Sequence, residues 1–286
     1  MKSKWNFVLG KITSLLVYPL HYSIGYLWAT LVGSLKSKIA FDVFRLPHYA
    51  FGVYEAALRA RQLGMKQITV IEFGVANGRG LMAMAKYAEI VQRNLGIKIS
   101  VIGFDSGAGM PRHEDYKDHP ELYLQGDFPM QEPGKLQNIL PGNTRLVICN
   151  LNTDDWSTLV SPEAPMGFIS IDVDYYSSTK NLLEHLMKAD SKKLMPNILF
   201  YFDDISLDNH NRYQGELLAI DESNAKPSLR KFDPYYSRLK TKQIFYNAPW
   251  LYHIYQLHVL DHPQRNEGYR KGNEEKRILG NKYLNS

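Results

Sequence analysis

Cysteine is almost absent from this chain, with Cys149 the only one among 286 residues. An intrachain disulfide framework and a multi-cysteine metal site are therefore excluded. A reducing, cytoplasmic setting is the default expectation for such a composition. The dinucleotide pattern Gly-x-Gly-x-x-Gly is also missing, which argues against a nicotinamide or flavin site. The sequence holds no internal repeat and no low-complexity tract.

Acidic residues are scarce at the two ends of the chain. Residues 1–67 hold nine Lys/Arg against two Asp/Glu, and residues 264–286 hold six against three. Residues 68–263 hold 19 against 24, so the basic ends flank a mildly acidic centre. An enzyme that acts on nucleic acid is more often basic around its cofactor domain. The charge pattern therefore disfavours a nucleic-acid partner.

The longest segment without Asp, Glu, Lys or Arg covers 24 residues, 12–35. It passes the length test for a membrane span, but Pro19, His21 and several small polar residues dilute it, and no signal-peptide cleavage site follows. Three interpretations stay open: a helical arm packed on the core or on a second subunit, a helix lying on a membrane surface through residues 1–38, and a true span. The expected layout is an arm over residues 1–45, a central domain over 46–263 and a basic tail over 264–286.

Five short apolar runs alternate with helical patterns along the centre of the chain, and each run ends before a polar residue. Such alternation predicts βαβ units and a parallel sheet with helices on both faces. The ligand crevice of such a sheet lies beyond the carboxyl ends of its strands, so the polar residues are expected to share one edge. The runs are residues 68–71, 99–104, 145–149, 168–171 and 198–202, ending before Glu72, Asp105, Asn150, Asp172 and Asp203.

Two long connections, residues 106–143 and 205–249, interrupt this alternation. They are expected to act as lids or binding loops, or as ordinary surface excursions. The histidines in them, such as His119 and His210, are expected to be solvated. The remaining expected elements are helices over residues 49–63, 80–95, 179–189 and 216–224, and a strand or hairpin over 250–260.

The first apolar run leads into a glycine-rich turn, VIEFGVANGRG at residues 70–80. The glycines let the backbone approach a ligand closely, and the Glu72 carboxylate can accept a hydrogen bond from an ammonium or amide group of that ligand. Asp105 ends the second run. It is placed to accept both hydroxyls of a ribose, as an acidic residue does at that point in nucleotide-binding folds.

The stretches EFGVANGRG and GFDSGAGMP together resemble the first two motifs of class I S-adenosylmethionine-dependent methyltransferases. The resemblance implies an α/β fold with a Rossmann-like, doubly wound, mostly parallel seven-stranded sheet, here preceded by a helical arm. It also implies that the turn holds the methionine part of the cofactor, Asp105 the ribose, and the end of the third strand the adenine. The cofactor-binding residues expected on this basis are Glu72, Gly74, Asn77, Gly78, Gly80, Asp105, Ser106, Asn150 and Leu151.

Four aspartates follow the fourth and fifth runs, in the stretches FISIDVDYYSST and LFYFDDIS. Adjacent strands that end together would bring these carboxylates into one crevice, where they repel and some take up protons. A hard divalent cation relieves the repulsion, and Mg²⁺ prefers carboxylate and water oxygens. The pattern resembles the macrocin O-methyltransferase group, metal-dependent enzymes that methylate sugar hydroxyls. That resemblance covers about residues 46–263 and implies Mg²⁺ ligands at Asp172, Asp203 and Asp204 and a general base at Asp174.

Two departures from the group lie near the expected acceptor. Ser177 replaces the usual Glu, and Ile205 and Ser206 replace the usual Tyr-Gly, which leaves the acceptor open. The leading hypothesis is a Mg²⁺-assisted methyltransferase that uses S-adenosylmethionine on a hydroxyl of a sugar or another small molecule. A nucleotide-sugar-dependent glycosyltransferase with an Asp172-x-Asp174 metal clamp and a non-catalytic cofactor-binding subunit are the alternatives. The Asn/Asp-Pro-Pro-aromatic stretch of base methyltransferases is absent, so nucleic-acid methylation is disfavoured.

Overall fold

The computed structural model of the chain describes residues 20–265, except 152, 207–209, 238–241, 243 and 246. Its centre is a seven-stranded sheet in the order β3-β2-β1-β4-β5-β7-β6. Strand β7 runs antiparallel to both neighbours, and the other four pairs are parallel. The strands are β1 Gln67–Phe73, β2 Lys98–Asp105, β3 Thr144–Ile148, β4 Met166–Ile171, β5 Leu194–Phe202, β6 Arg230–Pro234 and β7 Ile254–Val259.

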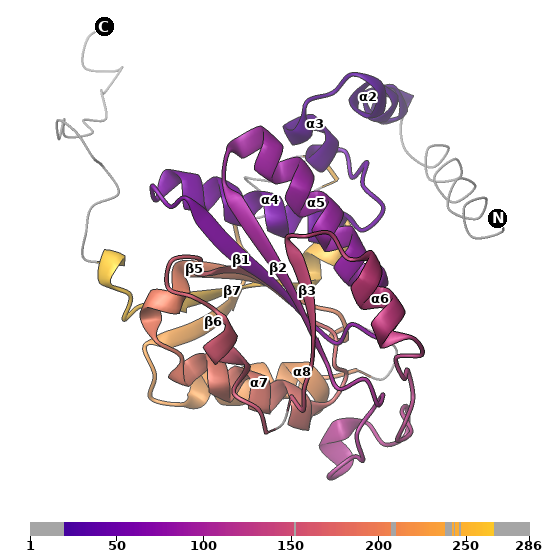
Figure 1. Cartoon of the computed structure of the whole chain (residues 1–286), viewed down its shortest axis with the longest axis vertical. Helices are drawn as coiled ribbons and strands as arrows, with labels where there is room; N and C mark the ends of the chain where they lie inside the picture. The colour runs from indigo at the N-terminus through magenta and orange to yellow at the C-terminus, as the bar shows by residue number, and fades with distance from the viewer. Residues whose placement is uncertain are drawn as a thin grey trace, which may run out of the picture.

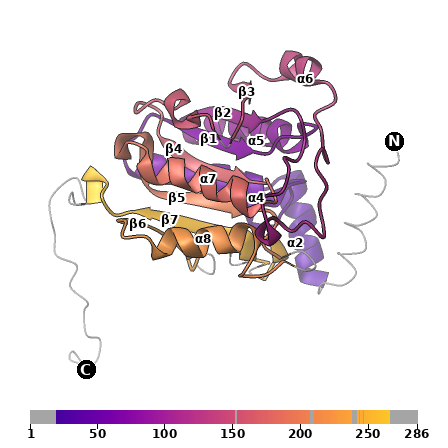
Figure 2. The ribbon, with the colours of Figure 1, turned by 90° about the horizontal axis from the view of Figure 1, so that it is seen from below.

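Helices cover both faces of this sheet (Figures 1 and 2), α4 and α5 on one face and α7 and α8 on the other. This arrangement confirms the predicted Rossmann-like, doubly wound, mostly parallel seven-stranded sheet. The α-helices are α2 Leu20–Leu31, α3 Leu35–Ala40, α4 Pro47–Gln62, α5 Arg79–Leu95, α6 Pro133–Ile139, α7 Tyr176–Lys188 and α8 Gly215–Ala225. Short 3-10 helices lie at Tyr116–Asp118, Trp156–Leu159, Ser191–Lys193, Pro249–His253 and Pro263–Arg265.

The central strands are buried along almost their whole length because both of their faces are covered. Every residue of β4 is buried, and so is nearly every residue of β1 and β5. Helix α4 packs very closely on this layer, since a Cβ placed on Gly52 would lie 2.3 Å from the Phe168 ring. That close approach brings the first turn of α4 to the carboxyl edge of the sheet, where the pocket lies.

Several elements differ from the sequence-based expectation. Strands β1 and β2 are longer than expected and include Glu72 and Asp105, because Glu72 still pairs with Gly103 of β2 and with Ser170 of β4. Strand β6 was not expected at all, since its sequence RKFDP is too polar to stand out and lies at the sheet edge. The apolar run at residues 250–260 divides into a 3-10 turn and β7.

Helices α2 and α3 are the first elements of the described residues, and they lie at the rim of the molecule (Figure 1). A break at residues 32–34 separates them, and Ser34 caps α3 by accepting a hydrogen bond from the Ser37 N–H at 3.2 Å. Among the residues described, no helix is both long and apolar enough to cross a bilayer. The first part of the expected arm, residues 1–19, and residues 266–286 of the expected tail lie outside the described residues.

Candidate active site

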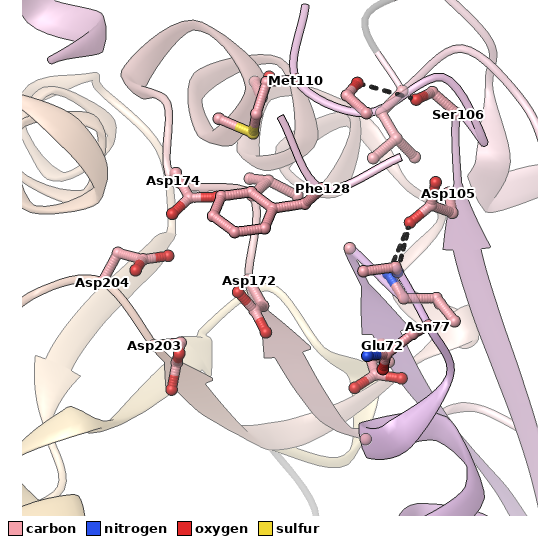
Figure 3. A pocket seen from close by; sticks show the side chains of 18 of the residues that line it. Glu72, Asn77, Asp105, Ser106, Met110, Phe128, Asp172, Asp174, Asp203 and Asp204 are labelled. Atoms are coloured by element: carbon pink, nitrogen blue, oxygen red, sulfur yellow. Dashed lines mark hydrogen bonds between the residues drawn. The ribbon is translucent and has the colours of Figure 1, made fainter. Parts of the chain in front are cut away.

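A pocket of about 690 Å³ opens at the carboxyl edge of the sheet. Thirteen residues were predicted from the sequence as site residues, and twelve of them line this pocket, whereas Gly78 does not. Figure 3 shows the four aspartates on one side of the pocket and Glu72, Asn77 and Asp105 on the other, with Phe128 lying between the two groups. The twelve residues are Glu72, Gly74, Asn77, Gly80, Asp105, Ser106, Asn150, Leu151, Asp172, Asp174, Asp203 and Asp204.

Two glycines of the turn are required because a side chain at either position would collide with neighbouring atoms. Gly74 has φ +82°, and a Cβ there would lie 1.7 Å from the Asp172 carbonyl oxygen. A Cβ on Gly80 would lie 1.8 Å from Oε1 of Glu72. Gly78, at φ +79°, precedes α5 and packs against Leu136 of α6 instead of facing the pocket. Gly74 therefore lets the chain that follows β1 pass close to the residue that follows β4, and Gly80 leaves room for one buried carboxylate.

That carboxylate belongs to Glu72, which is almost completely buried. The Tyr49 hydroxyl, from the first turn of α4, donates a hydrogen bond to Oε1 at 2.5 Å. Oε2 has no hydrogen-bond partner within the described part of the chain. Burial raises the pKa of Glu72 to about 8, and the bond from Tyr49 offsets part of that rise. An orphaned acceptor of this kind suits a cationic group of a ligand, which would restore the ionised form.

Asp105 has a structural role that the sequence did not indicate. Its Oδ2 accepts hydrogen bonds from the N–H groups of Val75 and Ala76, both at 2.8 Å, and its Oδ1 accepts one from Gly107 at 2.6 Å. These bonds hold the glycine-rich turn, in which Ala76 has φ +44°. Oδ2 is thus saturated, and only Oδ1 retains capacity for a further donor. The expectation that Asp105 accepts both ribose hydroxyls stays a prediction, and in this structure Oδ1 is the oxygen with room for such a bond.

Three of the four aspartates lie close enough to share one ion. One carboxylate oxygen from each of Asp172, Asp203 and Asp204 lies within 4.8 Å of the others. Burial, and then the charges of neighbouring carboxylates, raises the pKa of Asp172 and of Asp204 well above the usual range. Oδ2 of Asp204 is buried and has no hydrogen-bond partner in the described structure. Clustered hard oxygen donors with an unsatisfied oxygen fit a small divalent cation.

Asp174 differs from these three aspartates in its backbone conformation and in its interaction with Tyr123. It has φ +59°, a strained conformation for a residue with a side chain. Burial raises the pKa of its carboxyl, and a hydrogen bond from the Tyr123 side chain counteracts part of that rise. Tyr123 comes from the long connection after β2, residues 106–143, which is called the lid from here on and contributes directly to the site. A raised carboxyl pKa beside a pocket is typical of a proton-accepting group.

Glu216 was missed by sequence analysis because it looks like an ordinary acid at the start of a helix. It is almost fully buried behind Asp204, whose N–H donates a hydrogen bond to Oε2 of Glu216 at 3.1 Å. Burial is the largest cause that raises the pKa of Glu216 well above its usual value, and Asp174 adds to it. Glu216 therefore holds the loop that carries Asp204 through this hydrogen bond.

Ser177, the departure from the macrocin pattern, has a partner in the lid. The buried carboxylate of Asp118 accepts hydrogen bonds from the Ser177 N–H at 2.8 Å and from its hydroxyl at 3.0 Å. The lid thus supplies an acidic group at the start of α7 and is fastened there. The expectation of solvated histidines is wrong for His119, which follows Asp118, is fully buried and stacks on His210 with ring centroids 4.6 Å apart.

Neither a protein-family model nor a curated protein matches this sequence. Among solved structures, similarity is found to the calicheamicin methyltransferase CalS11, at 20% identity over 59% of this chain and 69% of that chain, with a TM-score of 0.45. Similarity is also found to the SAH-bound methyltransferase PaMTH1 of Podospora anserina, at 14% identity over 84% and 88%, with a TM-score of 0.38. These values are too low to identify a reaction, which must be inferred from the pocket.

Proposed function

We propose that this chain is an S-adenosylmethionine-dependent O-methyltransferase that methylates a hydroxyl of a small molecule with the help of a divalent cation. The observation that carries the proposal is the division of one pocket into two halves. One half offers a glycine-rich turn and the orphaned oxygen of Glu72, and the other offers the aspartate cluster. The seven-stranded sheet places both at its carboxyl edge, where such sheets bind ligands.

The cofactor half is suited to a molecule with a cationic end and a ribose. S-adenosylmethionine carries an ammonium group and, when bound, supplies an electrophilic methyl group. Oε2 of Glu72 would accept a hydrogen bond from the ammonium group, and Oδ1 of Asp105 one from a ribose hydroxyl, with Ser106 beside it. Asn150 and Leu151, which follow β3, line the same pocket and are the proposed adenine contacts.

The acidic half is suited to a metal and an acceptor hydroxyl. Asp172, Asp203 and Asp204 would hold Mg²⁺, and a bound cation would lower the pKa of a hydroxyl beside it. Asp174, which lines the pocket beside these three residues, would accept the proton of the acceptor hydroxyl. The hydrogen bond from Tyr123 keeps the Asp174 carboxylate oriented during that transfer. Phe128 and Met110 also line the pocket, with Phe128 lying between its two halves (Figure 3).

The first test is calorimetric binding of S-adenosylhomocysteine, with Mg²⁺ and with excess chelator. We expect binding in both conditions, and Glu72→Gln is expected to weaken it about tenfold or more because the charged hydrogen bond is lost. Asp203→Asn is expected to leave this binding intact and to abolish methyl transfer to a panel of hydroxylated acceptors. If Asp203→Asn abolishes the binding of S-adenosylhomocysteine as completely as it abolishes methyl transfer, the metal assignment is contradicted.

The outcome that would overturn the cofactor assignment is the absence of any binding of S-adenosylhomocysteine. Binding of a uridine nucleotide with Mg²⁺ in its place would favour the glycosyltransferase alternative. Two results together would count against both catalysis and the non-catalytic alternative. The first is that the wild-type protein binds S-adenosylhomocysteine but methylates no acceptor. The second is that Asp174→Asn does not change the interaction with a partner protein.

A further inference from the structure

Helix α2 presents an apolar face to solvent, on the side turned away from the rest of the protein. Its other face is packed, since Ala29 is fully buried and a Cβ placed on Gly25 would lie 2.6 Å from the Phe41 ring. The orientation of the helix is therefore fixed by small residues against an aromatic side chain. The solvent-facing side chains are between 51 and 73% exposed, and they are Ile24, Leu27, Trp28, Leu31 and Val32.

These five residues form a continuous stripe rather than scattered exposed positions. The spacings of three, four and seven that separate Ile24, Leu27, Trp28 and Leu31 place them on one side of a helix. A contiguous apolar stripe on an otherwise globular protein marks a contact surface. The helix has 12 residues, which is too short to cross a bilayer but suitable for lying in its interface.

The sequence on both sides of the stripe is basic. Residues 1–41 contain no Asp or Glu, and they contain five lysines, at positions 2, 4, 11, 36 and 38. The first acidic residue, Asp42, has its carboxylate 3.1 Å from the Lys242 ammonium group, so it does not offset these lysines. Lys36 and Lys38 lie on α3, directly after the stripe. An apolar stripe with a lysine-rich, acid-free flank complements an anionic surface.

We infer that the α2 stripe, residues 24–32, docks on the surface of a membrane that contains anionic lipids. Two copies of this chain paired through the same stripe would bring two acid-free, lysine-rich segments together, and their charges repel. Trp28 within the stripe also suits the level of the lipid headgroups, where indole rings bury their apolar part and keep their N–H in a polar layer.

The arm and the pocket share one edge of the molecule. Leu46 lines the pocket, and the six-residue step from the end of α3 to Leu46 spans at most about 20 Å. A docked arm therefore holds the mouth of the pocket near the lipid headgroups. In combination with the proposed function, on which this last step rests, a membrane-borne acceptor is the class of substrate that the geometry favours.

The test is co-sedimentation of the full chain with large unilamellar vesicles. We expect the protein to pellet with vesicles of phosphatidylcholine that contain about one third phosphatidylglycerol, and not with phosphatidylcholine alone. Added salt is expected to release it. Leu27→Glu combined with Leu31→Glu is expected to lower the bound fraction about tenfold. Leu229→Glu is the matched control, because Leu229 is 61% exposed and Leu27 is 59% exposed, and it is expected to bind as the wild type does.

Thermal unfolding and binding of S-adenosylhomocysteine are measured on the same variants. Unchanged values show that loss of vesicle binding is not loss of folding, and they separate this inference from the proposed function. Failure of the wild type to pellet with anionic vesicles would overturn the inference, and so would equal loss in the Leu229→Glu control. The stripe would instead be assigned to a second copy of the chain if the wild type is a dimer, the variant with Leu27→Glu and Leu31→Glu is a monomer, and neither protein binds vesicles.

Discussion

Gly80→Ala is the most informative single substitution in the pocket. Gly80 lies in the first turn of α5 and its backbone is helical, so Ala is intrinsically better there by up to about 1 kcal/mol. The tertiary structure opposes this gain. The new Cβ would lie 1.8 Å from Oε1 of Glu72 and 2.7 Å from the Tyr49 hydroxyl, so the buried carboxylate has to move and its hydrogen bond from Tyr49 is lost.

The size of the effect follows from these two opposing contributions. A hydrogen bond to a charged or buried carboxyl contributes about 1.5–3 kcal/mol, and after the helix gain is subtracted the expected net loss is about 0.5–2 kcal/mol. For a chain of this size that corresponds to a fall of roughly 1–5 °C in Tm. Because Oε2 of Glu72 is displaced as well, the affinity for S-adenosylhomocysteine is expected to fall about tenfold or more.

Gly134→Ala is the control for helix propensity. Gly134 lies in the first turn of α6, with nothing within 4 Å of the position of a Cβ. The same change there is expected to raise Tm slightly and to leave binding unchanged. Urea or thermal unfolding of both variants, with calorimetry of S-adenosylhomocysteine, makes the comparison. If Gly80→Ala proves as stable as Gly134→Ala and binds normally, the contact between the turn and Glu72 is not what shapes the pocket.

Three further predictions concern groups around the pocket. Tyr123→Phe removes the hydrogen bond to Asp174 and is expected to lower kcat about tenfold to a hundredfold with little change in cofactor affinity; an unchanged kcat would remove Tyr123 from the mechanism. Burial holds the pKa of His48 at about 3, below its ordinary 6.5, so between these values the unfolded state binds a proton that the folded state does not. The free energy of unfolding is therefore expected to fall as the pH drops below about 6.5, by up to about 1.4 kcal/mol per pH unit. His48→Phe is expected to flatten that slope in urea unfolding at several pH values, and an identical slope would refute it. Asp118→Ala leaves the Ser177 N–H without its acceptor and is expected to cost about 1–3 kcal/mol and to speed proteolysis within residues 106–130; protection equal to wild type would show that the lid is held elsewhere.

Local pattern was sufficient to predict the sheet and the edge at which the pocket lies. The strands β1, β4 and β5 are rich in apolar residues because helices cover both of their faces, and a segment of that kind is visible in sequence. The placement of Asp172 and Asp203 follows from the same pattern, since each comes directly after a strand. Strand β6 was missed because an edge strand needs few buried residues and this one includes Lys, Asp and Pro.

The sequence by itself therefore determined the order of the elements and the residues that surround the pocket, because both depend on neighbours within one strand and its turn. Only the tertiary structure decided how those residues are paired. Tyr49 meets Glu72 from a helix 23 residues earlier, and Asp118 meets Ser177 from a lid 59 residues away. Such pairings depend on how closely helices and loops pack on the sheet, and a local pattern carries no record of that distance.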